Sequence, residues 1–522
     1  MQSTLNKISG SIRSYSPLVR LIICATLSGL IHLTIFTIPF PLTKFYSTIP
    51  PVDYTKLTNY SPSGFFLYLF GVGALFGLYI WAIRLSIPDT SGSSSPAKAL
   101  IPAAEIGGQP LAVNGRFIFL TSAIFAIILI FSYPLTAIDL FIYAIRTRGW
   151  ALYGLQPLAT PPEALPTSDP WLGLAGEWVD AASPYGPLWE WLSLGVFHLS
   201  DGEFLAHLLA LKIIGALAYL GCIWFIYRIL KHSRPAWLTA GTIAFAWNPL
   251  VLFESVQNAH NDIVMVFFLL AAIWLFVQIT RVWRLNSMLL MLLFCVLLAL
   301  SILVKFVTVI VVPFFLIVAA MQQPTWFRRM ASLAVYGSVT TILIVGPMLP
   351  FWPGLENWAV LEASSGAGRS LLALLVLGLR ESLGTNTAFD LSRNFILLIF
   401  ALIYLYYLWQ TFTQRQLPPI ASAFFILFWY VLLAAPVFHA WYLLWFLPLA
   451  SLMLPQQRPI TAAIIFSVTA LLVIPYFETI RVWYPALLRN HLLGHLIGVP
   501  LLIVPPALVL LGWIRPHIKS EV

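Results

Sequence analysis

Apolar runs of about 20 residues recur from one end of this 522-residue chain to the other. They constrain the fold strongly, because a helix of that length spans the hydrocarbon layer of a membrane. Backbone groups in lipid must be hydrogen-bonded within the segment, so the runs are expected to be helices. A membrane β-barrel would alternate apolar and polar residues instead. Only 9% of the residues are charged, which is too few for a water-facing surface of normal size. We therefore expect an all-α, polytopic transmembrane helical bundle.

The runs predict about 14 helices. They lie roughly at 18–40, 63–85, 116–136, 204–230, 236–252, 263–280, 286–304, 305–320, 331–350, 394–412, 418–436, 440–454, 459–476 and 496–514. Three parts follow from this pattern. Residues 1–87 form an N-terminal tail and two leading helices, and residues 88–115, rich in Ser, Gly, Pro and Ala, form a flexible cytoplasmic linker. Residues 116–522 form the main transmembrane body, whose large external loop at 137–203 carries interfacial helices.

The basic residues predict the orientation of this bundle. Most of the 28 Lys and Arg residues fall on one side, which the positive-inside rule makes the cytoplasmic side. Both termini are then cytoplasmic, and nearly all of the 19 Asp and Glu residues lie outside. We expect a cell-membrane protein whose polar chemistry sits at the external face. The net charge of +9 comes from the cytoplasmic loops and does not indicate a nucleic-acid partner.

The external loop begins with a candidate catalytic carboxylate. Apolar residues at 138, 141, 142 and 145 have helical spacing, which predicts an amphipathic helix at the membrane interface. Asp139 and Tyr143 share one face of this helix. Asp139 lies within a turn of the membrane boundary, where a carboxylate is costly. A helix-capping Asp, or one paired with Arg146 or Arg148, explains the local pattern equally well.

A second polar cluster follows Asn248-Pro249. Glu254, Asn258, His260 and Asp262 lie close together between two apolar runs, at a density beyond what a short loop needs. Three interpretations of this cluster remain open: a plain polar turn, a contact with a sugar or phosphate, and a metal site. The metal signal is weak, because no matching cluster of ligands occurs elsewhere. The three cysteines lie inside apolar runs and show neither disulfide nor metal-ligand spacing.

Lys305 interrupts a long and otherwise apolar stretch. An ammonium inside the bilayer costs at least about 3 kcal/mol. If the stretch is two helices, Lys305 lies at their external hairpin and can point at a lipid phosphate. A snorkelling lysine at the interface is the alternative. Other external segments hold residues that would each suit an interfacial anchor, namely Tyr185 in a Pro-Tyr-Gly-Pro turn, Trp352, Arg369, His439, Trp441, Tyr442 and Arg481.

Together these motifs resemble the GT-C superfamily of membrane glycosyltransferases, and most of all the polyprenyl-phospho-mannose-dependent α-1,6-mannosyltransferase family. The likeness covers roughly residues 116–514. The residues that carry it are Asp139 to Arg148 with Gly154 and Pro157, Ser183-Pro184-Tyr185-Gly186-Pro187-Leu188-Trp189, Asn248-Pro249 through Asn258-Ala259-His260-Asn261-Asp262, Lys305-Phe306, Pro350-Phe351-Trp352 and Trp441-Tyr442-Leu443-Leu444-Trp445.

The resemblance implies an enzyme that takes a sugar, expected to be mannose, from a polyprenyl-phosphate donor. The acceptor would be a hydroxyl of a lipid-linked or cell-envelope glycan at the outer membrane face. An acid in the first large external loop would be the general base, and Asp139 occupies that place. Many relatives carry a second acid where this chain has Ile138, so Asp169 and Asp180 stay open as alternatives.

The chemistry agrees with this expectation. A base removes the hydroxyl proton as the oxygen attacks the anomeric carbon, and attack opposite the phosphate inverts the configuration. The departing phosphate needs cationic or hydrogen-bonding partners. No cofactor is required, and a divalent metal ion is compatible with the reaction but not expected. The candidate substrate-binding residues are Tyr143, Arg146, Tyr185, Asn258, His260, Asp262, Lys305, Trp352, Arg369, His439, Trp441, Tyr442 and Arg481.

Two other classes compete with the enzyme. A transporter or flippase of lipid-linked sugars would carry ionisable residues along a path through several helices. Here Lys212 and Lys305 are nearly the only charges within the apolar runs, so the sequence favours that class less. A non-catalytic scaffold would explain the helices but not the clustered external polar groups.

Overall fold

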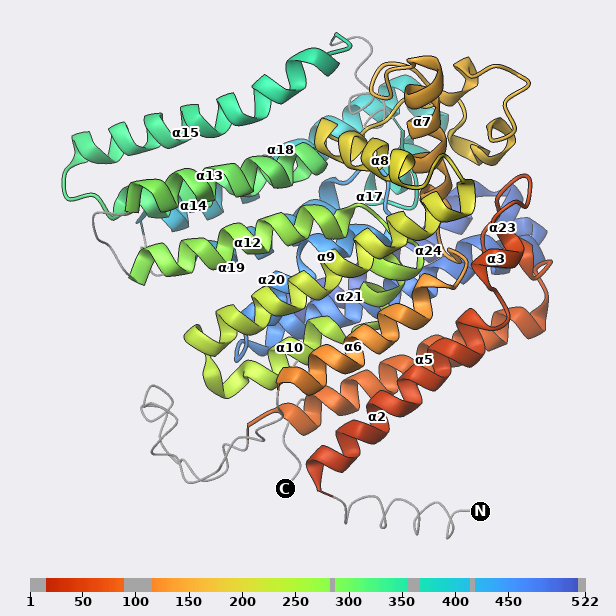
Figure 1. Cartoon of the computed structure of the whole chain (residues 1–522), viewed down its shortest axis with the longest axis horizontal. Coiled ribbons are helices and arrows are strands. Elements are labelled where there is room, and N and C mark those ends of the chain that lie inside the picture. The colour runs from red at the N-terminus through yellow and green to blue at the C-terminus, as the bar shows by residue number, and fades with distance from the viewer. Residues whose placement is uncertain (1–15, 89–114, 282–286, 355–365, 414–417, 515–522) are drawn as a thin grey trace.

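The computed structural model describes residues 16–88, 115–281, 287–354, 366–413 and 418–514 (Figure 1). Over these residues the chain is helical, with isolated bridges in place of strands. In this described part of the chain, eight helices are long and apolar enough to cross a membrane, or nine if the bent pair Pro235–Ala246 and Pro249–Gln257 is one span. Shorter apolar helices take the places of the other predicted runs, namely Gly115–Ile130, Met288–Val304, Phe306–Met321, Pro419–Ala434 and Ala440–Leu452. The predicted all-α, multi-pass fold is confirmed.

The bundle consists of the longer helices together with several short ones. In chain order the main helices are α2 (Pro17–Ile31), α5 (Pro62–Ser86), α6 (Gly115–Ile130), α9 (Phe204–Ser233), α10 (Leu238–Ala246), α12 (Asp262–Arg281), α13 (Ser287–Val304), α14 (Val312–Met321), α15 (Trp326–Met348), α18 (Thr385–Thr413), α19 (Pro419–Trp429), α20 (Leu447–Leu452), α21 (Gln457–Pro475) and α24 (His491–Leu510). The shorter elements are α3 (Leu42–Phe45), α4 (Tyr54–Leu57), α7 (Asp139–Tyr153), α8 (Pro187–Leu199), α11 (Pro249–Leu252), α17 (Leu371–Leu383), α22 (Arg481–Trp483) and α23 (Pro485–Arg489).

Local sequence sets where several of these helices begin. Ser61, Thr325 and Ser370 each accept a hydrogen bond from a backbone N–H of the first turn of α5, α15 and α17. Such side chains satisfy donors that have no partner inside the helix. The helices run side by side, and α7 and α8 gather at one end of the bundle, toward which α3 and α23 also lie (Figure 1).

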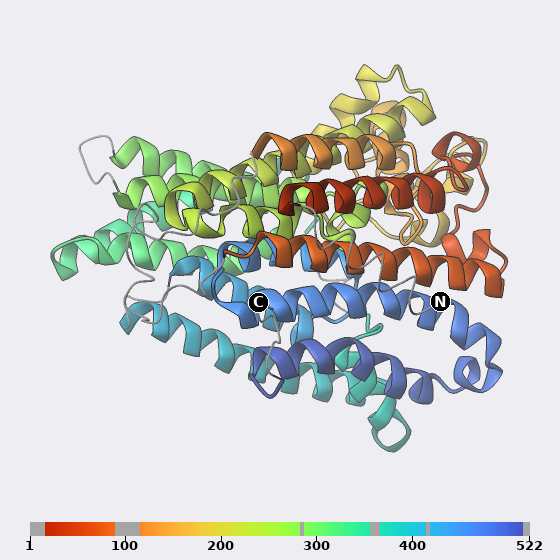
Figure 2. The same cartoon turned by 90° about the horizontal axis from the view of Figure 1, so that it is seen from below.

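The two leading helices pack into the body of the bundle. The Tyr79 hydroxyl of α5 donates to the Ala244 carbonyl at 2.6 Å, and the Tyr68 hydroxyl donates to the Leu471 carbonyl at 3.3 Å. Figure 2 shows the orange α5 alongside the blue C-terminal helices, consistent with the contact between α5 and α21. These helices therefore belong to the same core as the site. The predicted linker at 88–115 lies almost entirely outside the described residues.

Helix α7 differs from the amphipathic interfacial helix that the sequence predicts. Every residue from 139 to 147 is buried, so α7 has no solvent-facing polar side along its first turns. Helices α8 and α9 pack against it, and the chain that follows α7 folds back over it. Gly154 then ends the helix with φ +68°, a left-handed conformation that favours glycine. This tertiary cover decides the environment of Asp139.

Candidate active site

Asp139 occupies the first turn of α7 and is 6% exposed. Its Oδ1 accepts a hydrogen bond from the Tyr185 hydroxyl at 3.4 Å. Burial raises the pKa of Asp139 above its usual value, while the positive charges of His260, Lys305 and Arg146 oppose that shift. Within the described chain no Lys or Arg forms an ion pair with this carboxylate. Asp139 is therefore a buried carboxylate that is not neutralised by direct pairing.

Arg146 and Arg148, the possible partners of Asp139 in the sequence, bind other groups. Arg146 donates from Nη2 to the carbonyls of Ala181 and Ala182 at 2.7 and 3.1 Å. Arg148 pairs with Asp169 at 2.8 Å. The structure therefore has no ion pair between Asp139 and either Arg146 or Arg148.

The two alternative acids have different settings. Asp169 accepts hydrogen bonds from the Tyr153 hydroxyl at 2.7 Å and the Trp171 N–H at 2.9 Å, besides its ion pair with Arg148. Burial alone would raise the pKa of Asp169, but these hydrogen bonds and the guanidinium hold it below its usual value. Asp169 is thus a structural anchor of the loop. Asp180 is exposed.

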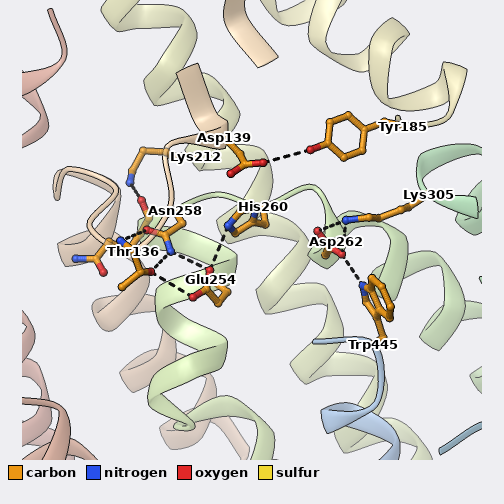
Figure 3. A network of polar contacts seen from close by, with 11 residues as sticks. Thr136, Asp139, Tyr185, Lys212, Glu254, Asn258, His260, Asp262, Lys305 and Trp445 are labelled. Carbon is orange, nitrogen blue, oxygen red and sulfur yellow. Dashed lines mark hydrogen bonds and ion pairs between the residues drawn. The ribbon is translucent and has the colours of Figure 1, made fainter. Parts of the chain in front are cut away.

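Lys305 lies at the helix break that the sequence predicts. Helix α13 ends just before it, its own backbone is extended, and a 3-10 helix, η8 (Phe306–Val311), follows. Its ammonium donates to both oxygens of Asp262 at 2.8 and 2.9 Å, and the Trp445 indole N–H also donates to Asp262 (Figure 3). The rings of Tyr185, Tyr442 and Trp445 lie 5.4, 5.5 and 5.6 Å from the ammonium. Lys305 is therefore enclosed by one carboxylate and three aromatic rings.

A second network lies beside Asp139 (Figure 3). Glu254 Oε1 accepts from the Thr136 hydroxyl at 3.2 Å, and Oε2 accepts from the Asn258 amide at 2.9 Å. Glu254 Oε2 also lies 3.2 Å from Nε2 of His260. The His260 ring stacks on Trp441 with centroids 4.0 Å apart. Thr136 precedes Asp139 by three residues, so this network reaches the start of α7.

The segment that carries this network differs from the external polar corner that the sequence suggests. Every residue from 240 to 262 is buried, and residues 253–257 form a π-helical turn, η7 (Phe253–Gln257). Lys212 of α9, itself fully buried, donates to the carbonyls of Ser132 and Gln257 and so clamps this turn. The polar groups are interior because α6 and α9 pack over them. Asn248 caps α11 at Leu250 N and does not join the network.

His439, Trp441 and Tyr442 line the same region from η11 (Ala440–Trp445) and the residue before it. The His439 ring stacks on Trp441 with centroids 4.2 Å apart. Trp441 therefore stacks on two histidines, His439 and His260. The Tyr442 ring stacks on Trp445 at 4.3 Å. Burial, and then the charges of Arg369, Lys305 and His260, hold the pKa of His439 well below its usual value.

Arg369 and Arg481 lie around one aromatic ring. Their guanidinium carbons are 5.5 and 5.4 Å from the centre of the Phe477 ring. Arg369 forms an ion pair with Glu478, and Arg481 Nη2 lies 3.3 Å from Nδ1 of His491. Both arginines are partly exposed. They form a basic patch, and the charge of Arg369 also acts on His439.

Three other candidate residues lie in different surroundings. Tyr143 is buried and its ring packs edge-on against Tyr185 and Trp189 at 5.3 and 5.1 Å. Arg146 is 5% exposed and its charge acts on Glu190, whose pKa burial raises to about 7. Trp352 is 46% exposed.

Sequence reasoning missed several partners in these contacts. Glu254 and Asn258, which the sequence places in one polar cluster, pair with each other across the π-helical turn η7. The sequence contained only a weak signal for Trp445, namely its position in the Trp-Tyr-Leu-Leu-Trp string. Nothing local identifies Glu478 as the partner of Arg369, because they are 109 residues apart. Within the described residues, no group of three or more His, Cys, Asp and Glu is placed to hold a metal ion.

The fold and this site define a class: a polytopic helical membrane protein with a buried polar centre at one end of its bundle. Residues 46–321 match the family model described as "Alpha-(1->6)-mannopyranosyltransferase, N-terminal domain", and residues 358–487 match the "MptB C-terminal domain". The first match covers more than half of the chain, and the chain belongs to this family.

One curated relative is Alpha-(1->6)-mannopyranosyltransferase Rv1459c of Mycobacterium tuberculosis (strain ATCC 25618 / H37Rv). It is 24% identical over 102 residues, which are 20% of this chain and 17% of the relative. The match thus spans less than a fifth of the relative's length. No solved structure matches this chain.

Proposed function

We propose that this protein is a glycosyltransferase that moves a mannosyl residue from a polyprenyl-phosphate donor to a hydroxyl of a lipid-linked or cell-envelope glycan. Asp139 is the general base, and the configuration at the anomeric carbon inverts. Family membership supports the reaction class and the sugar. The observation that carries the proposal is the buried Asp139 carboxylate, without a Lys or Arg ion-pair partner in the described chain, next to His260 and Lys305.

The setting of Asp139 suits proton abstraction from an alcohol. A carboxylate in a dry site is poorly solvated, and burial raises its affinity for a proton. A carboxylate paired with arginine, as Asp169 is, would be a weaker base. General-base catalysis contributes roughly 100- to 10,000-fold to such reactions.

The cations around the site suit the other half of the reaction. As the acceptor oxygen bonds to the anomeric carbon, the bond to the phosphate oxygen breaks and its electron pair stays on the phosphate. That charge needs stabilisation at the moment it develops. We propose Lys305 and Arg369 for this role; their side chains are 15% and 38% exposed, and each also has an acidic partner within the chain.

The test is transfer of labelled mannose from polyprenyl-phospho-mannose by the full chain reconstituted in liposomes. Asp139→Asn keeps the shape and removes the base, so we expect the rate to fall by about 100-fold or more. Asp180→Asn is the matched control, because Asp180 lies in the same external segment but is exposed, and it should keep wild-type activity.

Thermal unfolding of both variants shows whether they are folded. Equal rates for Asp139→Asn and wild type would remove Asp139 from the mechanism. If wild type transfers no mannose from this donor, the proposed reaction is wrong.

A further inference from the structure

A cavity of about 360 Å³ lies at the end of the bundle away from Asp139. Helix α21 begins there at Gln457 and runs toward η12 (Tyr476–Ile480), α22 and α23, and α23 lies toward the same end as α7 (Figure 1). The walls come from α19, α21, α24 and the turn before α21. The lining residues are Phe425, Gln456, Gln457, Arg458, Pro459 and Leu510. None of them belongs to the candidate active site.

Arg458 supplies the charge of this cavity, because a guanidinium is always protonated in a protein. Within the described residues no Asp or Glu forms an ion pair with it. By contrast Arg234, whose guanidinium binds the chain just before the cavity, donates to the carbonyls of Leu452 and Leu454. The donors of Arg458 are therefore available to a ligand.

Arg458 nevertheless has a defined position. A Cβ at Gly512 would lie 2.7 Å from Cζ of Arg458 and 2.8 and 2.9 Å from its two terminal nitrogens. The guanidinium therefore lies directly against the backbone that follows α24. Gly512 has φ +82°, a conformation that favours glycine for a second reason. Arg458 is thus held between α21 and the end of α24, unlike an arginine that extends freely into solvent.

The charges at this end of the bundle have one sign. The described helices begin or end here with basic residues, which include Arg20, Arg84, Arg116, Arg228, Lys231, Arg234, Arg328, Arg329 and Arg458. Among the described residues, no Asp or Glu lies in the turns at this end. The potential there favours an anion. The same basic residues predict that this end faces the cytoplasm.

Trp513 indicates the depth of the cavity in the membrane. It is 80% exposed and directly follows Gly512. Tryptophan at the end of a membrane helix typically lies at the level of the lipid headgroups. Phe425, Pro459 and Leu510 give the cavity an apolar wall beside Arg458. An anionic group that carries apolar chains matches this combination, and a soluble anion matches only half of it.

We propose that this cavity binds the phosphate of an anionic glycerophospholipid. The Arg458 guanidinium donates two parallel hydrogen bonds to the free oxygens of the phosphodiester. The side-chain amides of Gln456 and Gln457 provide donors for other lipid oxygens, and Phe425 and Leu510 contact the start of the acyl chains. Basic pockets between transmembrane helices on the cytoplasmic side suit such headgroups. This site is independent of the proposed function.

The test measures the binding of phosphatidylglycerol to the full chain in detergent, by native mass spectrometry of the retained lipid and by thermal unfolding. We expect phosphatidylglycerol to bind and to raise the melting temperature, because a ligand of the folded state stabilises it. Neutral phosphatidylcholine should do neither. Arg458→Gln should weaken the binding of phosphatidylglycerol about 10-fold, because it removes charge-assisted hydrogen bonds. Arg328→Gln is the matched control, since Arg328 is exposed at the same end but lies outside the cavity.

Gly512→Ala tests the position of the charge instead of its presence. It displaces the Arg458 guanidinium and leaves the net charge unchanged, so it should also weaken the binding of phosphatidylglycerol. If Arg458→Gln does not fold, Arg458→Lys decides, because lysine keeps the charge but cannot make the bidentate contact. Wild-type affinity in Arg458→Lys would then contradict the site.

Three further results would overturn the proposal. Wild-type affinity in a folded Arg458→Gln would remove Arg458 from lipid binding. Equal losses in Arg458→Gln and Arg328→Gln would show a general attraction between charges and no site. Displacement of phosphatidylglycerol by inorganic phosphate or polyprenyl phosphate at equal or lower concentration would show that the cavity takes another anion. Mannose transfer is no part of these measurements, so its failure would leave this proposal standing.

Discussion

Lys305 meets Asp262 where both charges have lost most of their water. The exposed fraction of the side chain is 15% for Lys305 and zero for Asp262. Moving charges from water into protein is costly, and only a close, fully hydrogen-bonded pair offsets the cost. The bidentate contact, the Trp445 indole and the three surrounding rings meet that requirement. At the residue scale, the pair is a stability element as well as a part of the site.

Breaking the ion pair between Lys305 and Asp262 should therefore lower the free energy of unfolding. Lys305→Met leaves the Asp262 carboxylate buried without a cation, and we expect a loss of about 3–5 kcal/mol in the free energy of unfolding. Adding Asp262→Asn should recover most of that loss, because the uncompensated charge is gone. Lys231→Met, at an exposed lysine of α9, is the control. Thermal unfolding in detergent measures all three, and an unchanged melting temperature for Lys305→Met would contradict this account.

At the scale of elements, the contact between α8 and α13 places two parts of the site next to each other. The Gly186 N–H, just before α8, donates to the Val304 carbonyl at the end of α13 at 3.0 Å. A Cβ on Gly186 would collide with the Leu303 carbonyl, which is backbone and cannot rotate away. The glycine is thus required by a close approach. It holds Tyr185 and Lys305 together.

Gly186→Ala should push these two elements apart. We expect a loss of about 1–3 kcal/mol in stability, as for other overpacked sites, and a fall in mannose transfer beyond what the lost stability explains. Gly195→Ala is the matched control on α8, because a Cβ there meets nothing within 4 Å and alanine favours the helix. Melting temperature and transfer rate are measured on both variants. Equal behaviour of the two would show that the approach at Gly186 can relax.

At the scale of the whole molecule, the site sits at one end of the bundle, so the direction of insertion decides which compartment it faces. Helix α9 runs from Phe204 to Ser233 and is long enough to span the membrane. Glu203 and Lys231 are exposed residues at its two ends. The basic residues predict that the Glu203 end, which lies toward the site, is external.

Cysteine labelling tests this orientation. A membrane-impermeant maleimide should label Glu203→Cys in intact cells and Lys231→Cys only after permeabilisation. The background should be low, because the three native cysteines are free but buried. The reverse pattern would place the site on the cytoplasmic side.

The helices and their breaks could be predicted because their causes are local. An apolar run of sufficient length forms a helix in lipid wherever it occurs, and Lys305 marked a true break between two helices. The position of Asp139 at the start of a helix was likewise readable from apolar spacing. The sequence did not predict that this helix is buried on all sides, because its cover comes from α8, α9 and the loop between α7 and α8.

By itself, then, the sequence determined the class of fold, because the bilayer demands apolar helices of a given length and leaves few other solutions. Tertiary structure decided which charge meets which. Lys305 finds Asp262 across 43 residues, and Asp262 finds Trp445 across 183. Each buried polar group needs a partner, and several in the chain could have served. Only the packing of the helices selects among them, because helical periodicity relates residues a turn or two apart and says nothing about distant helices.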